Sequence, residues 1–318
     1  MQKPHPRTYA AAHFAMELDG SDEVGLFRNI DGGAIRADVM THSVGGMYDR
    51  GKQLGKPKFE DFKLQVGMAM SKPFYGWISA FFRGEAPRKN GAVVAADFYY
   101  AERARREFTE AMIREITIPK FDGNDRGPVY MGVTIAPETI ELRPGNASRK
   151  LAPPKGFDTQ KLWTACNFSL SIDGLDQACA RTSKIESFTV KQAMSEHAVG
   201  GIRYAVKVPG PVEFPNLVFY VPTADAQPFA DRMKKFGIEG RVPSLIASRG
   251  DASSARLTGE ITTQDNGGND LFRIEFSGAD ITSVTPDRLD AGSDEIHQTR
   301  VELYVESMSF SYLGAAVV

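Results

Sequence analysis

The chain has 318 residues, of which 42% are hydrophobic and 25% are charged, and its formal net charge is −2. This length favours two domains, and the near-neutral charge argues against a nucleic-acid binder that acts through a basic field. The sequence has no apolar run long enough to span a bilayer and no signal-peptide pattern near its start, so we expect no membrane segment and assembly in the cytoplasm.

The first predicted elements are strands. Apolar and polar residues alternate over 13–19, which is typical of a half-buried strand, and Asp19-Gly20 predicts a turn. A second strand is predicted over 35–44; Gly45-Gly46 and a polar loop up to Lys58 follow it. Alternation resumes over 62–68 with one apolar and one polar face, the pattern of an antiparallel sheet.

A short aromatic helix is predicted over 73–83, with a proline near its start. Its counterpart over 228–237 keeps fewer aromatic residues. Such a stripe packs either against the chain's own sheet or against another subunit, where aromatic residues are enriched. The candidates for a contact between subunits are Trp77, Phe81, Phe82 and Phe236.

The rest of the first half is predicted to form further strands. Residues 93–100 read as strand, whereas 101–118 carry apolar side chains at a period of four, as on a helix. The corresponding stretch 272–285 is rich in β-branched residues, so we predict strands in both, with a turn near 102–105. A further strand is predicted over 129–135.

The same series of elements occurs twice in the chain. Residues 35–46 return as 190–201, each with a histidine (His42 or His197), a small residue, Val and a Gly pair. The neighbours repeat in the same order: Phe14–Gly20 with Phe168–Gly174; Phe62, Leu64 and Val66 with Leu217, Phe219 and Val221; Pro73-Phe74 with Pro228-Phe229; Val133 and Ile135 with Leu303 and Val305; Ile140 and Leu142 with Phe310 and Tyr312. The apolar parity slips between the last two sets in both copies, which predicts one β-bulge twice.

The chain is therefore interpreted as a tandem duplication. We predict a first domain over 1–145, a linker over 146–161 that is rich in Pro and Gly, and a second domain over 162–318. The predicted fold class is mainly β: two tandem antiparallel β-sandwich or half-barrel domains, each with one short helix. Such modules leave open sheet edges, and open edges invite pairing with another chain.

Motifs for catalysis or ligand binding are weak. Residues 46–52 match the opening of a phosphate-binding loop, but Gln53 stands where Ser or Thr should hold Mg²⁺. His42 and His197 have no second ligand at metal spacing, no nucleophile elbow occurs, and the two cysteines form no metal or redox motif. We therefore assign no catalytic, cofactor-binding or metal-binding residue and expect no enzymatic activity.

Together these motifs resemble the tail tube protein family of contractile-tailed phages and related injection machines. The resemblance rests on the opening strand that ends in Asp-Gly (14–20 and 168–174), a strand that ends in Val-Gly-Gly, a loop with Lys and Pro, an alternating strand, and a short helix. It implies a structural role, in which β-sandwich subunits form six-fold rings whose inner sheets join into one barrel around a channel.

The resemblance also implies how the rings assemble. It places the loop after the second strand at the contact between stacked rings, and the residues designated there are Gly45, Gly46, Arg50, Lys52, Lys56, Gly200, Gly201, Arg203 and Lys207. The implied partners are further copies of the chain, sheath, baseplate and tail-terminator proteins, and DNA or protein cargo that passes without specific binding. The implied location is a virion tail or tail-like particle.

Because the chain carries two copies of the module, we expect three chains to complete a pseudo-six-fold ring. The copies differ at outward positions, with Lys63 and Gln65 against Val218 and Tyr220. Three alternatives stay open: a baseplate hub or tube-initiator protein with two tube-like domains, an enzyme, and a carbohydrate-binding sandwich.

Overall fold

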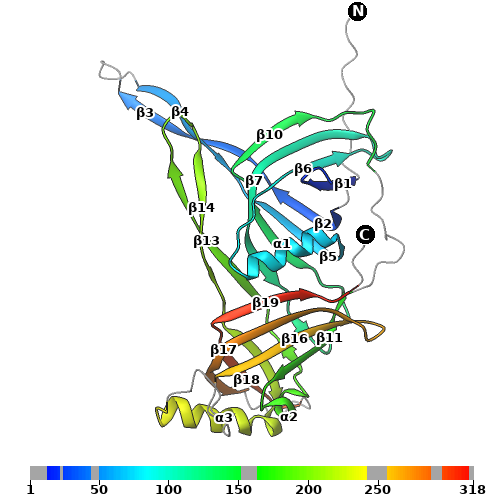
Figure 1. Cartoon of the computed structure of the whole chain (residues 1–318), viewed down its shortest axis with the longest axis vertical. Coiled ribbons are helices and arrows are strands. Elements are labelled where there is room, and N and C mark those ends of the chain that lie inside the picture. The colour runs from blue at the N-terminus through cyan, green and yellow to red at the C-terminus, as the bar shows by residue number, and fades with distance from the viewer. Residues whose placement is uncertain are drawn as a thin grey trace, which may run out of the picture.

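The computed structural model describes residues 13–21, 24–43, 50–151, 163–241, 256–287 and 296–314. The two halves of the chain lie one above the other along the long axis of the molecule, with the first half uppermost in Figure 1. Both halves are mainly β and repeat the same order of elements, which confirms the predicted fold class. The predicted domain boundaries stay a prediction.

The first half contains one long helix and a series of strands. Its elements are β1 (His13–Leu18), β2 (Gly25–Gly32), β3 (Ile35–Ser43), β4 (Arg50–Phe59), β5 (Phe62–Met70), α1 (Lys72–Phe82), β6 (Lys89–Ala96), β7 (Glu102–Ile118), β8 (Phe121–Asp122), β9 (Met131–Ala136) and β10 (Thr139–Pro144). α1 has Pro73 in its first turn, and Gly84 just past its end takes a φ of +76°.

The second half repeats this order with additional short helices. Its elements are β11 (Trp163–Ile172), α2 (Asp176–Cys179), β12 (Lys184–Ile185), β13 (Phe188–Ala198), β14 (Ala205–Glu213), β15 (Leu217–Pro222), η2 (Thr223–Asp225), α3 (Gln227–Met233), η3 (Lys234–Ile238), β16 (Leu257–Asp265), β17 (Asp270–Pro286), β18 (Gln298–Tyr304) and β19 (Ser307–Tyr312). α3 and η3 together occupy the predicted helix over 228–237.

Each half is a sandwich of two antiparallel layers. Layer A contains β1, β6, β10 and the first part of β7, while layer B contains β2, β5, β9 and the last part of β7. In the second half, β11, β16, β19 and the first part of β17 form layer A, and β12, β15, β18 and the last part of β17 form layer B. The long strands β7 and β17 therefore belong to both layers.

The repeated bulge exists, but not where the apolar parity slips. Residues 137–138 and 305–306 are the short turns that join β9 to β10 and β18 to β19. The bulge lies in the long strands, between Ile113 and Glu115 and again between Ile281 and Ser283, where each strand passes from layer A to layer B.

The strand registers also change the predicted alignment of the two copies, by two residues near the end of the repeat. Val133 pairs with Leu64, and Val301 rather than Leu303 pairs with the equivalent Phe219. The registers of β10 and β19 likewise match Ile140 with Met308 and Leu142 with Phe310.

Two further sequence predictions are wrong. The polar loop expected up to Lys58 includes the strand β4, which pairs with β3 in an isolated two-stranded hairpin. The turn expected near 102–105 lies earlier, at 97–101, where Asp97 accepts hydrogen bonds from the backbone N–H groups of Tyr99 and Ala101. β7 is a strand, as predicted, but it lacks the turn expected in its first residues.

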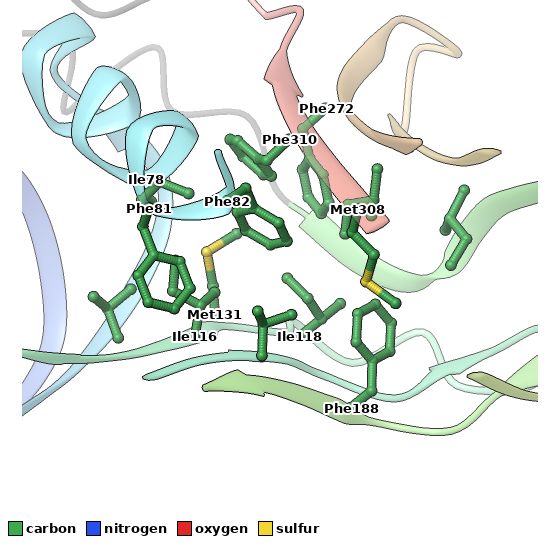
Figure 2. Close-up of a cluster of buried hydrophobic side chains, with 14 of the residues drawn as sticks. Ile78, Phe81, Phe82, Ile116, Ile118, Met131, Phe188, Phe272, Met308 and Phe310 are labelled. Atoms are coloured by element: carbon green, nitrogen blue, oxygen red, sulfur yellow. The ribbon is translucent and has the colours of Figure 1, made fainter. Parts of the chain in front are cut away.

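The cores of the two halves meet in one continuous cluster of buried side chains. Figure 2 shows this junction, where aromatic residues of α1 lie beside Phe272, Met308 and Phe310 from the second half and above Ile116 and Ile118 of β7. Within the described ranges, the helices are all too short or too polar to cross a membrane.

Candidate assembly surfaces

Layer B of the first half meets layer B of the second where β8, just beyond β7, pairs antiparallel with β12 in the register Phe121–Ile185 and Asp122–Lys184. The end of β7 pairs antiparallel with the start of β13 in the register Ile118–Phe188, Thr117–Thr189, Ile116–Val190 and Glu115–Lys191. The Thr117 and Thr189 hydroxyl oxygens are 2.9 Å apart, and the Ile116 and Val190 side chains are fully buried. The eight residues of this β7–β13 pairing are called the internal joint below.

The two halves are also joined beside the internal joint, where α1 packs on β19. The Tyr75 and Tyr312 rings stack with centroids 3.7 Å apart, and Phe82 stacks on Phe310 at 5.8 Å. The Ser79 hydroxyl donates to the Phe310 carbonyl oxygen at 3.0 Å. Burial raises the pKa of the Tyr75 hydroxyl, which stays protonated and donates to the Met68 carbonyl oxygen at 2.6 Å.

Two hairpins, β3–β4 and β13–β14, extend from the sandwiches as arms (Figure 1). The second arm is anchored to the base of the first, because the Phe59 and Tyr204 rings meet edge to face at 6.0 Å. Arg88 also donates to the Lys207 carbonyl oxygen at 2.7 Å. Each arm has a register shift at the same point, between Ala37 and Val39 and between Gln192 and Met194.

The predicted ring-stacking residues fall into three groups. Gly45 and Gly46 lie outside the described residues. The side chains of Arg50, Lys52, Lys56 and Arg203 are exposed on the arms, and Gly200 and Gly201 form the turn of the second arm, where Gly201 takes a φ of +87°. Lys207 differs, because its side chain is 9% exposed and its Nζ lies 3.3 Å from Asp61 Oδ1.

The Lys207 contact predicts an asymmetry between two substitutions. Asp61→Asn leaves the nearly buried Lys207 ammonium group without its carboxylate partner and with the Phe59 carbonyl oxygen at 3.4 Å, so we expect a loss of about 2 kcal/mol in unfolding free energy. Lys207→Met should cost less, because Asp61 keeps Arg114 at 2.7 Å. Urea unfolding measures both, with Arg203→Ala as the exposed control; a larger loss for Lys207→Met would contradict the assignment.

The aromatic helix residues are placed within the chain. Trp77, Phe81 and Phe82 are at most 3% exposed, and the Trp77 indole N–H donates to the Pro87 carbonyl oxygen at 3.0 Å. In the second half Arg232 replaces Trp77; its guanidinium group binds Asp280 at 2.8 Å and lies over the Phe236 ring at 4.6 Å. Phe82 contacts Phe310 in the other half of the same chain, and a contact of these residues with another subunit stays a prediction.

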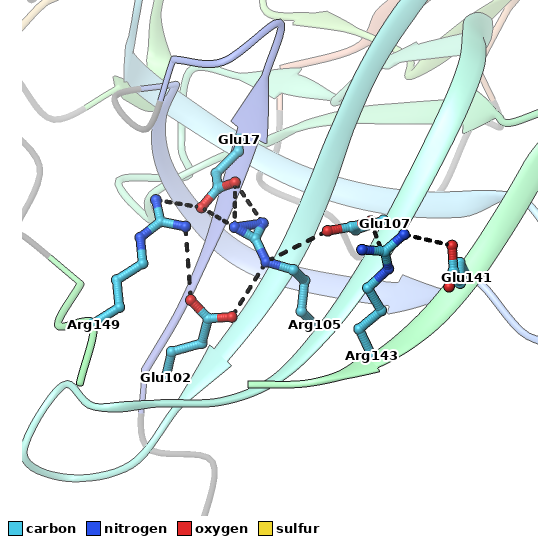
Figure 3. A network of polar contacts seen from close by, with 7 residues as sticks. All are labelled: Glu17, Glu102, Arg105, Glu107, Glu141, Arg143 and Arg149. Atoms are coloured by element: carbon cyan, nitrogen blue, oxygen red, sulfur yellow. Dashed lines mark hydrogen bonds and ion pairs between the residues drawn. The ribbon is translucent and has the colours of Figure 1, made fainter. Parts of the chain in front are cut away.

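The face of layer A that points away from the core carries a network of arginine and glutamate side chains in the first half (Figure 3). Arg105 binds Glu17 at 2.6 Å and Glu102 at 3.2 Å, and Arg149 binds the same two carboxylates at 2.7 and 3.7 Å. Because Arg149 lies beyond β10, the network ties the end of the first half to β1 and β7. Arg143 extends it through Glu107 and Glu141, each at 2.9 Å.

The histidines and cysteines belong to no group that could hold a metal ion in the described part of the chain. His42 lies on the first arm, and His197 on the second arm contacts the Ser195 hydroxyl at 3.2 Å. Cys166 is half-buried, whereas Cys179 is buried in α2, and this burial raises the pKa of the Cys179 thiol to about 12.

The two thiols are therefore expected to react at different rates. At pH 8 an aromatic disulfide reagent should modify Cys166 quickly and Cys179 slowly, because the Cys179 thiolate forms only as the pH approaches 12. Thiol titration of native and unfolded chain gives both rates, and Cys166→Ser should remove the fast phase. Equal rates in the native chain would contradict the burial of Cys179.

The residues of the internal joint were not predicted from the sequence. A signal is present, because Ile116-Thr117-Ile118 and Phe188-Thr189-Val190 both read apolar, Thr, apolar. Such triplets place two apolar side chains on the core face and one threonine on the other face. Neither triplet shows by itself that the other is its partner.

The fold and its surfaces define a duplicated β-sandwich protein with a shared core, two hairpin arms and sheet edges at both ends. The family model described as T4-like virus tail tube protein gp19 matches residues 10–146 and again 164–309, and the chain belongs to this family. The double match also confirms the predicted tandem duplication.

Several solved structures are similar to part of this chain. They include the sheath–tube complex of the extracellular contractile injection system PVC in its extended state (16% identity, 46% of this chain and 89% of that chain, TM-score 0.34). They also include the anti-feeding prophage baseplate (16%, 42% and 80%, 0.32) and Hcp1 of the E. coli EAEC 042 pathovar (14%, 46% and 89%, 0.25). No curated protein matches the chain.

Proposed function

We propose that this chain is a structural subunit of the inner tail tube of a phage tail or tail-like contractile injection particle, without enzymatic activity. Three chains form a ring with pseudo-six-fold symmetry around a channel, and rings stack into a tube. The observation that carries this proposal is the internal joint together with the adjoining β8–β12 pairing, through which layer B of one half is joined to layer B of the other. Repeating the same joint between chains extends the sheet further, and a sheet extended in this way can close into a barrel.

In the proposed ring, layer B is the wall of the channel. Its core face is covered by layer A and the helices, which fit outside the barrel because the outer circumference offers more room. The other face of layer B then faces the channel, and its exposed or half-buried side chains include Lys63, Gln65, Thr134, Tyr220 and Arg300.

The channel face carries charges in pairs of opposite sign. Asp31 lies opposite Lys63, and Glu115 lies opposite Lys191 in the internal joint. Arg300 binds Glu302 at 2.9 Å. Paired charges on neighbouring strands largely cancel beyond their own site, so the wall attracts neither a polyanion nor a polycation strongly. This property supports passage of DNA or protein cargo without specific binding.

One charge reversal should convert the channel into a DNA-binding surface. Assembled Asp31→Lys particles are expected to retain a short double-stranded DNA at about 0.15 M salt, where native particles do not, because the channel focuses the added positive potential. Fluorescence anisotropy of labelled DNA measures retention. Glu141→Lys changes the charge equally on the face of layer A that points away from the core and should retain less DNA; equal retention by both variants would contradict the assignment of the channel face.

The remaining surfaces support the proposed partners. The arms carry exposed basic side chains beyond the sandwiches and are proposed to contact the next ring. The layer A face with the arginine–glutamate network lies on the outside of the ring, where a sheath protein would meet it. Baseplate and tail-terminator proteins would meet the two ends of the tube, and the assembled particle is the proposed location.

Native mass spectrometry and end-on electron microscopy of the purified chain test the proposed function. Three chains in a ring with six similar lobes would support it. Six chains around one channel would contradict the stoichiometry, and a monomer at every concentration would overturn the tube proposal as a whole.

A second candidate is a baseplate hub or tube-initiator protein with the same trimeric ring. The differences between the halves on the channel face, Lys63 and Gln65 against Val218 and Tyr220, give the ring true three-fold symmetry. A three-fold ring suits a protein that joins a six-fold tube to a three-fold partner. Stacked tubes in the micrographs would favour the tube subunit, and single rings would favour the initiator.

A further inference from the structure

Each end of the molecule carries one half of the internal joint without its partner. Ile35 in the first half occupies the position that Val190 occupies in the second. The next residues, Arg36 and Lys191, are paired at the same point of their arms, with Lys58 and Glu213 respectively. The bulge in β17 makes Val284 the equivalent of Ile116, because both residues follow the bulge at the same distance and pair with the valine of the next strand.

These equivalent edges are unpaired within the described chain. β3 pairs with β4 alone, and the last residues of β17 pair with β18 alone. Ile35 is 43% exposed, whereas Val190 is fully buried, and Val284 is half-buried, whereas Ile116 is fully buried. The apolar strand edges at the two ends of the molecule are therefore at least partly exposed, whereas the equivalent edges inside the chain are paired and buried.

The contact between α1 and β19 also has an unpaired equivalent at each end of the molecule. α1 packs on β19 inside the chain, while the equivalent elements α3 and β10 lie at opposite ends of the molecule (Figure 1). Leu142 on β10 is 62% exposed, and its equivalent Phe310 is 4% exposed under α1. The end with β17 and α3 is thus complementary to the end with β3 and β10.

We propose that a second copy of this chain occupies each of these ends in a defined register, with Ile35 of one copy opposite Val284 of the next and Arg36 opposite Ser283. In the same contact, Leu142 of the first copy packs on the α3–η3 helix of the next. This inference rests on the proposed ring and adds to it the residues that join one chain to another. The contact is head to tail, and such contacts form a ring when the rotation from copy to copy closes, as in the proposed trimer.

The copy-to-copy joint is weaker than the internal joint. α3 and η3 have Ala230 and Gly237 where α1 has Tyr75 and Phe82, so the joint between chains lacks the stacked rings found within one chain. Stacked aromatic pairs add to the energy of buried area. Rings are therefore expected to dissociate into folded single chains on dilution, with each internal joint intact.

Disulfide cross-linking tests the register. In a Cys166→Ser background, Ile35→Cys with Val284→Cys, and Arg36→Cys with Ser283→Cys, form two adjacent pairs of the proposed ladder. One of two adjacent antiparallel pairs has the shorter Cα separation that favours a disulfide. Mild oxidation should therefore link chains into covalent dimers and trimers for at least one variant, as seen by denaturing electrophoresis without reductant.

Matched controls separate the register from the ring itself. Val190→Cys with Ile116→Cys, the equivalent internal pair, should cross-link within one chain without a gain in mass. Val39→Cys with Val284→Cys is out of register and should not link. Rings in micrographs without a cross-link in either test variant would overturn the register and leave the proposed function standing, whereas single chains at every concentration would overturn both.

Discussion

Replacing Phe310 with alanine is expected to lower the free energy of unfolding by about 3 to 5 kcal/mol. Phe310 is 4% exposed and lies between Phe82 of α1 and Phe272 of β17, with ring centroids 5.8 and 5.3 Å away. Its removal leaves a cavity at the junction of the two halves, where β-sheet on one side and α1 on the other limit collapse (Figure 2). Urea unfolding at low protein concentration measures the loss.

The duplication supplies a matched control for this substitution. Leu142 occupies the equivalent position on β10 and is 62% exposed in the single chain, so Leu142→Ala should change the unfolding free energy by less than about 0.5 kcal/mol. The same variant should raise the concentration needed for ring assembly, because Leu142 is proposed to be buried there. Equal losses for Phe310→Ala and Leu142→Ala in the single chain would show that the halves do not depend on this junction.

The elements that could be predicted from the sequence are those with one buried face. β5 alternates buried and exposed side chains from Phe62 to Val66, and α1 buries an aromatic stripe, so both have a clear period. The repeat added further information, because the equivalent stretch 272–285 is rich in β-branched residues and so favoured a strand over 101–118. The family followed from the same order.

The elements that were missed lack a clear apolar period in the sequence. β4 begins Arg50-Gly51-Lys52-Gln53 and belongs to a two-stranded arm with solvent on both sides, so burial imposes no alternation on it. β2 was missed because it is bounded by glycines: Gly33 takes a φ of +73°, and a Cβ there would lie 2.1 Å from the Phe62 ring. These glycines mark the close approach of β2 to β5, which a search for apolar periods does not detect.

The assembly surfaces were only partly predictable for a different reason. Lys207 and Arg203 look alike in the sequence, yet the Lys207 side chain reaches back to Asp61 at the base of the other arm. The pairing of β7 with β13 joins positions about seventy residues apart, and no local pattern fixes such a register. The open edges were expected in general terms, but their positions required the fold.

Ile35→Lys is expected to abolish ring assembly and leave the single chain folded. Ile35 is 43% exposed in the single chain, so a lysine there stays hydrated, whereas its equivalent Val190 is fully buried in the internal joint. In the proposed ring the lysine would enter the same environment opposite Val284, and burying an unpaired ammonium group costs several kcal/mol. Because this cost recurs at every joint of the ring, native mass spectrometry should show single chains where the native protein shows trimers.

Two variants with the same change of charge decide whether the effect comes from the strand edge. Leu54→Lys lies on the same arm, 61% exposed and outside the proposed pairing, and should still form rings. Val190→Lys places the charge inside the internal joint and should destabilise the single chain itself. Rings formed by Ile35→Lys at the native concentration would mean that the edge of β3 stays open to solvent in the assembly, and the sheet would then have to close through another strand.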